Sequence, residues 1–277
     1  MTVEEYNELK ARSLCCNVEL SFDEFDFREI KTGDVILKKW KSKDKICEIP
    51  DFITEISNNA FNDCVWLESI DFCNSGVKVI PSRLFYNLTN LKKVKLSNKI
   101  EMIESQAFYN TGIQEILFPD SLKEIGTEAF KNNRQLTNVC FGENSRIQKI
   151  KNESFMDTNI KLFHAPDSLE RIYSKAFYHC HNLEEVYLGK GIIHISHEVF
   201  SYCNSLKKVE INKEAPLKSI SKLLFFSCNS LEEVILNQNV DTVNEYALFG
   251  CKSLSKIIGI EDVKLLHYTA LKGTPLE

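Results

Sequence analysis

Cysteine is the residue type in this sequence with the greatest capacity for chemistry, because thiolates bind metals, attack electrophiles and pair as disulfides. Five of the ten cysteines share one position of a repeating unit, and these are Cys64, Cys180, Cys203, Cys228 and Cys251. If the units stack, like positions lie roughly 5 Å apart, which is close enough for disulfides or a thiolate cluster.

Two observations favour a different interpretation of these thiols. The shared position also holds Leu88, Thr111, Asn133 and Thr158, a variety that a metal ladder would not tolerate. The other cysteines show no Cys-x-x-Cys spacing, so the usual zinc pattern is missing. We therefore predict buried, reduced thiols with weak S–H bonds to the backbone, and keep a local metal site or disulfides as the alternative.

Histidine is the other residue type that suggests a metal. His179, His181, His194 and His197 fall within two neighbouring units, with His-x-His and His-x-x-His spacings. They occupy variable turn positions, however, so we favour imidazoles that are solvated or bonded to the backbone. The sequence also has no P-loop, nucleophile-elbow, zinc-protease or dinucleotide-binding motif. We predict no catalytic residue, no cofactor and no metal, and hence a protein that is not an enzyme.

A repeat of 22 to 25 residues determines where all of these side chains lie. Its strongest mark is a phenylalanine, at positions Phe61, Phe85, Phe108, Phe130, Phe155, Phe177, Phe200 and Phe225, and Leu248 and Leu271 continue the series. An aliphatic residue stands five positions before each of these. A segment of the form L-x-x-V-x-L follows each phenylalanine, and its alternation predicts a short strand with one buried face. A unit this small cannot enclose a core, so the pattern predicts a solenoid with one parallel strand per repeat and a helical or 3₁₀ turn at the phenylalanine.

The full unit resembles the BspA type of leucine-rich repeat. The stretch from Leu169 to Cys180, L-x-x-I-x-x-x-A-F-x-x-C, carries the pattern almost intact, and the resemblance extends from about Ile46 to Leu271. It implies a curved, right-handed leucine-rich-repeat solenoid of about ten units over residues 46–277. Relatives of this type include surface adhesins, so the resemblance also implies an adhesin-like role.

The two ends differ from the repeat. Residues 1–45 lack it, and Thr2 with Glu5 predicts a helix near residues 3–14. We interpret residues 1–45 as an N-terminal cap, with a separate docking element as the alternative. The C-terminal end has little cap of its own, which would leave apolar surface for homo-oligomers that associate end to end.

The open face of the predicted sheet is where a partner would bind. On each strand, the residue between the two buried aliphatic residues points outward, and in several units it is apolar or amphipathic. We predict a partner-binding concave strip formed by Leu117, His164, Tyr187, Glu210, Ile235 and Ile258. Strand propensity alone is the alternative explanation for such residues.

Charge and hydropathy restrict the partner and the location. The net charge is −5 without a basic stretch, which argues against nucleic acid, and no apolar run is long enough to span a membrane. The N-terminus lacks a signal-peptide pattern, so we predict a cytoplasmic protein, with unconventional export to the cell surface as the alternative. The predicted function is a non-catalytic scaffold that binds a protein, such as a phosphatase or another signalling enzyme. A BspA-type adhesin is the alternative.

Overall fold

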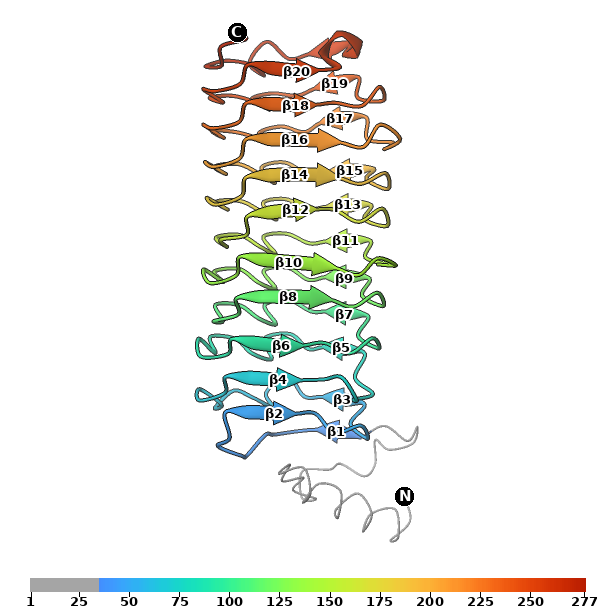
Figure 1. Ribbon diagram of the computed structural model, residues 1–277, viewed down its shortest axis with the longest axis vertical. Helices are drawn as coiled ribbons and strands as arrows, with labels where there is room; N and C mark the ends of the chain where they lie inside the picture. Colours follow the sequence, from blue (N-terminus) through green and yellow to red (C-terminus); the bar gives the residue numbers. More distant parts are fainter. Residues whose placement is uncertain (1–34) are drawn as a thin grey trace.

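The strands of this protein are held in two rows because each turn of the chain has two short extended segments. The computed structural model describes residues 35–277, which form a stack of similar coils (Figure 1). The L-x-x-V-x-L segments form one row: β2 (Ile46–Glu48), β4 (Ser69–Asp71), β6 (Lys93–Lys95), β8 (Glu115–Phe118), β10 (Asn138–Phe141), β12 (Leu162–His164), β14 (Glu185–Leu188), β16 (Lys208–Ile211), β18 (Glu233–Ile235) and β20 (Lys256–Ile258).

The second row consists of two-residue strands that end at the aliphatic residue preceding each phenylalanine. They are β1 (Ile36–Leu37), β3 (Glu55–Ile56), β5 (Val79–Ile80), β7 (Met102–Ile103), β9 (Glu124–Ile125), β11 (Lys149–Ile150), β13 (Arg171–Ile172), β15 (His194–Ile195), β17 (Ser219–Ile220), β19 (Thr242–Val243) and β21 (Leu265–Leu266). The prediction of one strand per repeat was therefore wrong. A two-residue strand leaves no alternating pattern in the sequence, so it could not be recognised there. These segments are strands because they pair with the neighbouring coils.

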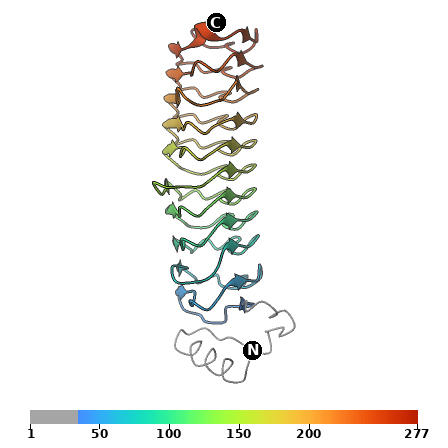
Figure 2. The ribbon, with the colours of Figure 1, turned by 90° about the vertical axis from the view of Figure 1, so that its right-hand side faces the viewer.

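Every pairing is parallel and joins like positions of neighbouring coils, for example Tyr187 with Glu210 and Ile172 with Ile195. The row of longer strands is continuous from β12 to β20 but is interrupted between β6 and β8 and between β10 and β12. In the view at right angles, the two rows run along different sides of the stack (Figure 2).

The phenylalanines form the predicted spine of the core. All eight, from Phe61 to Phe225, are fully buried. Successive rings have centroids 5.0 to 5.7 Å apart, as for Phe108 and Phe130 or Phe200 and Phe225. Offset stacking of this kind adds about 0.5–1.5 kcal/mol per pair to the free energy gained by burial.

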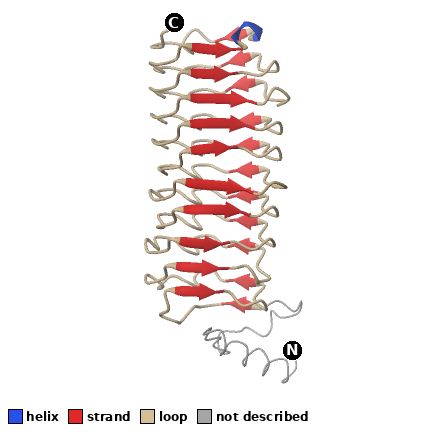
Figure 3. Cartoon of the chain, viewed as in Figure 1, coloured by secondary structure: helices blue, strands red, loops and turns tan. Residues whose placement is uncertain are grey.

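The turn that carries each phenylalanine is not helical, contrary to the prediction. Left-handed residues bracket it, such as Lys175 and His179 with φ of 59° and 58°. This backbone directs alternate N–H groups toward the next coil: Phe177 N donates to Val199 O at 3.0 Å and His179 N to Ser201 O at 3.1 Å. A helix would use these donors internally, whereas here they join coils. Among residues 35–277 the single helical element is the 3₁₀ turn η2 (Ile260–Asp262), blue in Figure 3.

The stack is an almost straight column rather than a curved one (Figures 1 and 2). Curvature would need one side of each coil to be spaced more widely than the other. Here both sides carry paired strands, and strand pairing imposes about the same spacing of 4.7–4.9 Å on each. The predicted concave strip therefore lies on a long, nearly flat face.

The stack begins ahead of residue 46. Strand β1 pairs with β3, and the ring of Trp40 stacks on Phe61 with centroids 6.2 Å apart. Part of the predicted N-terminal cap, from residue 35, is thus the first coil. The predicted helix near residues 3–14 lies outside the described residues.

Candidate functional site

The cysteine column lies in the core, as predicted. Cys180, Cys203, Cys228 and Cys251 have no exposed surface, and each Sγ lies 3.0 to 3.2 Å from the carbonyl oxygen of the phenylalanine one coil earlier. Burial raises the pKa of Cys180 to about 12. The eight cysteines of the described region are free thiols. In Cys180, Cys203, Cys228 and Cys251 the thiols contribute packing and hydrogen bonds to the core.

The four clustered histidines do not converge on one point. His181 Nδ1 lies 3.1 Å from Tyr202 O, His194 Nε2 lies 3.1 Å from Ser196 Oγ, and His197 Nδ1 lies 3.2 Å from Ser174 Oγ. The ring of His179 stacks on Tyr178 with centroids 4.2 Å apart. Each imidazole thus has local partners. No group of three or more His, Cys, Asp or Glu side chains within residues 35–277 is arranged to hold a metal ion.

The predicted strip lies on what we call the long-strand face, the outward side chains of β2 to β20. Five of its six residues form one row in the continuous sheet, in the order His164, Tyr187, Glu210, Ile235 and Ile258. Leu117 lies opposite Cys140 on the separate pair β8 and β10. The structure therefore brings five of the residues together and places the sixth across an interruption of the sheet.

These six side chains differ in how free they are to meet a partner. Leu117 is 63% exposed and Ile258 is 39% exposed, whereas Tyr187, Glu210 and Ile235 are half-buried. The Tyr187 hydroxyl accepts a hydrogen bond from Asn212 Nδ2 at 2.6 Å, and the ring centroid lies 6.1 Å from that of His164. Glu210 forms an ion pair of 3.1 Å with Lys208. Tyr187 and Glu210 thus already have partners within the fold.

Exposed and half-buried apolar side chains gather around the interruption between β10 and β12. We call this region the central window and define it by Leu117, Val139, Cys140, Phe141, Leu162 and His164. Leu162 is 50% exposed, Cys140 and His164 are exposed, and Val139 and Phe141 are only half-buried, although their counterparts in most other coils are buried.

A change of residue size accompanies this interruption. The buried valine position of β12 holds Phe163, whose ring packs 4.4 Å from Phe177, and the following leucine position holds Ala165. Val186 and Leu188 occupy the corresponding positions of β14. The prediction of the strip left out Leu162, Val139 and Phe141, and the exchange of large and small residues at Phe163 and Ala165 was the signal that could have identified them.

Ion pairs lie on this face, or next to its strands, on either side of the central window. Lys207 pairs with Glu184 at 3.2 Å and Lys256 with Glu233 at 2.7 Å, each pair joining neighbouring coils. At the other end, Lys95 pairs with Asp71 at 3.2 Å. The apolar central window is therefore bordered on both sides by ion pairs, the arrangement of an apolar patch with a polar rim.

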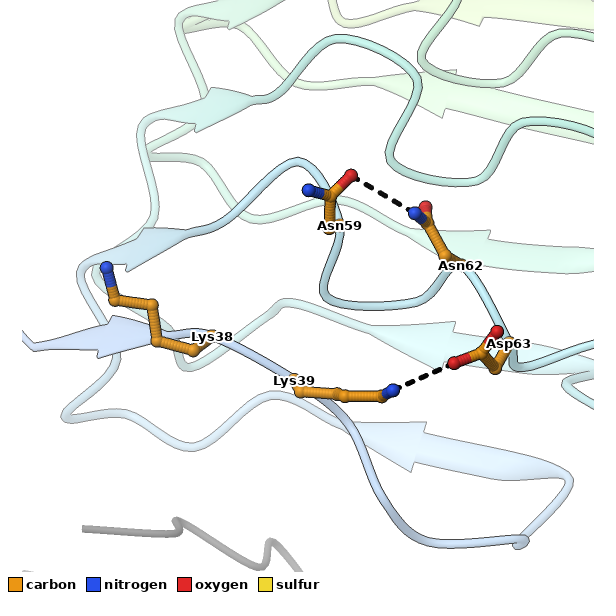
Figure 4. Close-up of a pocket in the computed structure, with 5 residues that line it drawn as sticks. All are labelled: Lys38, Lys39, Asn59, Asn62 and Asp63. Carbon is orange, nitrogen blue, oxygen red and sulfur yellow. Dashed lines mark hydrogen bonds and ion pairs between the residues drawn. The ribbon is translucent and has the colours of Figure 1, made fainter. Parts of the chain in front are cut away.

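A shallow hollow lies near the N-terminal end of the stack (Figure 4). It has a volume of about 570 Å³ and is lined by Lys38, Lys39, Asn59, Asn62 and Asp63. Lys39 Nζ bonds Asp63 at 2.8 Å, and Asn62 Nδ2 donates to Asn59 Oδ1 at 3.1 Å. Four of its five side chains thus engage one another, and small-molecule sites are usually mostly apolar. We assign no ligand to this hollow.

Comparison with known proteins agrees with this architecture. The model of the BspA type leucine rich repeat region matches residues 41–137 and 148–277. The structure of a leucine-rich repeat protein from T. pallidum aligns with a TM-score of 0.53 at 18% identity, over 80% of this chain and 84% of that one.

Two further solved structures are similar at lower scores. A leucine rich cell surface protein from Faecalibacterium prausnitzii aligns with a TM-score of 0.49 at 19% identity, over 83% of this chain and 76% of that one. The pneumococcal vaccine antigen PcpA aligns with a TM-score of 0.49 at 19% identity, over 85% and 82% of the two chains. A search of curated proteins gives no match. No helix among residues 35–277 has the length and apolar character needed to cross a bilayer.

Proposed function

Because the chain belongs to the BspA type of leucine-rich repeat proteins, we propose that it is a non-catalytic scaffold that binds another protein through its long-strand face. A stack of coils presents a rigid surface to which each repeat adds one row of side chains. The single observation that carries the proposal is the central window, where exposed Leu117 and Leu162 lie between the ion pairs of Lys207 with Glu184 and of Lys95 with Asp71.

A partner would gain most of its affinity from this window. Side chains that are apolar, exposed and held by a rigid sheet lose little entropy on binding, and a few such residues usually dominate an interface. Tyr187, Ile235 and Ile258 extend the same face toward the C-terminal end as secondary contacts. The charged pairs beyond the window would act as the solvated rim.

The test compares two matched double variants in affinity capture from native lysate. Leu117→Ser with Leu162→Ser removes apolar surface from the window. Val79→Ser with Met102→Ser removes exposed apolar surface from β5 and β7 in the other row, where the two side chains are 38% and 37% exposed. A protein retained by the wild type and by the Val79/Met102 variant, but lost with the Leu117/Leu162 variant, is the expected result. Retention by both variants would exclude the window as the binding site.

A second candidate function is that of a cell-surface adhesin, and family membership supports this more than it supports a cytoplasmic scaffold. The family resemblance implies surface adhesins, and one structural neighbour is described as a cell surface protein. The cytoplasmic location and the regulation of a phosphatase or other signalling enzyme stay predictions. Protease treatment of intact cells separates the two functions, since a surface protein is degraded and a cytoplasmic one is protected until the cells are permeabilised.

A further inference from the structure

Cationic side chains on the surface of the stack are commonly neutralised by an acid on a neighbouring coil. Lys123 pairs with Glu101 at 2.6 Å, Lys222 with Glu245 at 2.6 Å, and Lys190 with Asp167 at 3.0 Å. These pairs join like or adjacent positions because the register stacks each position on its counterpart. The fold thus has a general way of balancing its surface charge.

One row departs from this arrangement. Lys149, Arg171 and His194 are stacked in register on β11, β13 and β15. None of the three forms an ion pair with another residue of 35–277. Burial lowers the pKa of His194, and the nearby Arg171 charge lowers it further. Like charges placed directly opposite each other are destabilising, so the Lys149–Arg171 contact costs the fold stability. Glu124 lies opposite Lys149 on the other side of the row, but it forms its ion pair with Lys151 rather than with Lys149.

A second row of hydrogen-bond donors lies beside the first. Each strand continues, past a buried isoleucine, to Lys151, Tyr173 and Ser196. Lys151 Nζ lies 4.8 Å from the centroid of the Tyr173 ring. We call these six side chains, Lys149, Lys151, Arg171, Tyr173, His194 and Ser196, the cationic grid.

The cationic grid is locally positive in an acidic protein. It holds three permanent cations, Lys149, Lys151 and Arg171, while Glu124 stands opposite Lys149 and Glu170 precedes Arg171 in the sequence. Glu124 is already engaged, since its Oε2 lies 3.6 Å from Lys151 Nζ. Lys149 and Arg171 are half-buried, so packing against the sheet restricts the motion of their side chains.

We propose that the cationic grid is a docking site for an acidic, extended segment of a protein partner that lies along the stack and places carboxylates on Lys149 and Arg171. Carboxylates are the groups that neutralise lysines elsewhere on this surface, in the same register. The planar guanidinium of Arg171 binds a carboxylate through two parallel hydrogen bonds, which gives direction as well as charge. The site belongs to the row of short strands, so it does not depend on the long-strand face.

The test uses the full chain and a fluorescein-labelled oligoglutamate peptide, with binding followed by fluorescence anisotropy. Wild-type protein should bind the peptide, and binding should weaken between low and physiological ionic strength. Lys149→Gln with Arg171→Gln should weaken it by about tenfold or more. Lys218→Gln with Lys264→Gln removes the same charge from exposed lysines that stand just before β17 and β21, and should change binding less than about twofold.

Three outcomes would overturn the proposal. Wild-type protein could fail to bind oligoglutamate, both double variants could lose affinity equally, or a sulfated oligosaccharide could bind at the grid in place of the peptide. Thermal unfolding provides a separate readout. The Lys149/Arg171 variant should be at least as stable as wild type, because it removes a like-charge contact, whereas a merely structural role for these residues would make it less stable.

Discussion

At the scale of single residues, the cysteine position shows how the repeat constrains the size and hydrogen bonding of one side chain. In Cys180, Cys203, Cys228 and Cys251 the Sγ reaches the carbonyl oxygen of a phenylalanine, and Thr158 Oγ1 in the same column donates to Phe155 O at 2.8 Å. Most of these positions hold a Thr or Cys whose side chain can donate a hydrogen bond, although Leu88 shows that an apolar side chain also fits. This accounts for the mixed composition of the column without any catalytic or metal-binding role.

The exposure and pKa of these thiols predict their reactivity. In native protein treated with iodoacetamide at mildly alkaline pH, exposed Cys140 should react first among the described cysteines, and Cys180, Cys203, Cys228 and Cys251 should stay unmodified. A pKa of about 12 leaves Cys180 almost without thiolate, and burial excludes the reagent. Peptide mass spectrometry measures the labelling site by site, and all cysteines should react after denaturation. If Cys203 in native protein were labelled as fast as Cys140, the cysteine column would not be buried.

At the scale of the structural element, the turn around each phenylalanine depends on backbone conformation more than on residue type. The position two residues after the phenylalanine is left-handed in every coil from Asn87 to Gly273, yet it holds Asn, Asp, His, Tyr, Ser and Gly. Left-handed backbone costs a residue with a Cβ roughly 1–2 kcal/mol. From Asn87 to Gly250 the N–H group at this position donates to the next coil, as Ser227 N does to Phe249 O at 2.8 Å, and this hydrogen bond offsets part of that cost.

Ser227 provides a clean test, because Gly250 and Gly273 occupy the same position in the next two coils. Ser227→Gly should leave the free energy of unfolding within about 0.5 kcal/mol of wild type, while Ser227→Val should lower it by about 1–2 kcal/mol, since a β-branched side chain tolerates φ of 56° poorly. Urea unfolding measures both. Ser219→Val, in strand β17, is the control and should not destabilise. Equal stability of the two Ser227 variants would mean that this backbone conformation carries no strain.

The same element shows where prediction from the sequence succeeds and where it fails. Phe177 and its counterparts predict the repeat, the core and the register, because burial of a large side chain constrains residue type strongly. The left-handed turn and the two-residue strand of each coil have no clear residue pattern in the sequence. Almost any residue can make the backbone hydrogen bonds to a neighbouring coil on which they depend. The outward row containing Tyr187 is predictable from alternation. The central window does not follow from alternation, and its one signal in the sequence is the exchange of large and small residues at Phe163 and Ala165.

At the scale of the whole molecule, the column is a one-dimensional object in which each coil contacts mainly its neighbours. The stack of phenylalanine rings runs through it without a break from Phe61 to Phe225. Cooperativity must therefore pass from coil to coil through this stack. A lesion in the middle has a different effect from a lesion near an end.

Phe155→Ala with Phe177→Ala should divide unfolding into two transitions. Each substitution leaves a cavity that costs about 3–5 kcal/mol, so the middle of the column becomes its weakest interface. Differential scanning calorimetry should then resolve the two halves, whereas Phe61→Ala with Phe85→Ala should loosen the first coils and leave one main transition. A single, uniformly lowered transition in both variants would show that the column unfolds as one unit.

The hydrogen bonds that the turns around each phenylalanine make to the next coil have a consequence for biosynthesis. In the turns around each phenylalanine, the donors of one coil point to carbonyl groups of the coil that follows it in sequence, as Phe200 N does to Leu224 O. A nascent chain leaves the ribosome N-terminus first, so every coil emerges before the acceptors that complete it. The coils should therefore fold one after another from the N-terminal end, and folding should lag synthesis by one repeat. Stalled nascent chains of increasing length should gain protease resistance in steps, each a full coil behind the last residue exposed.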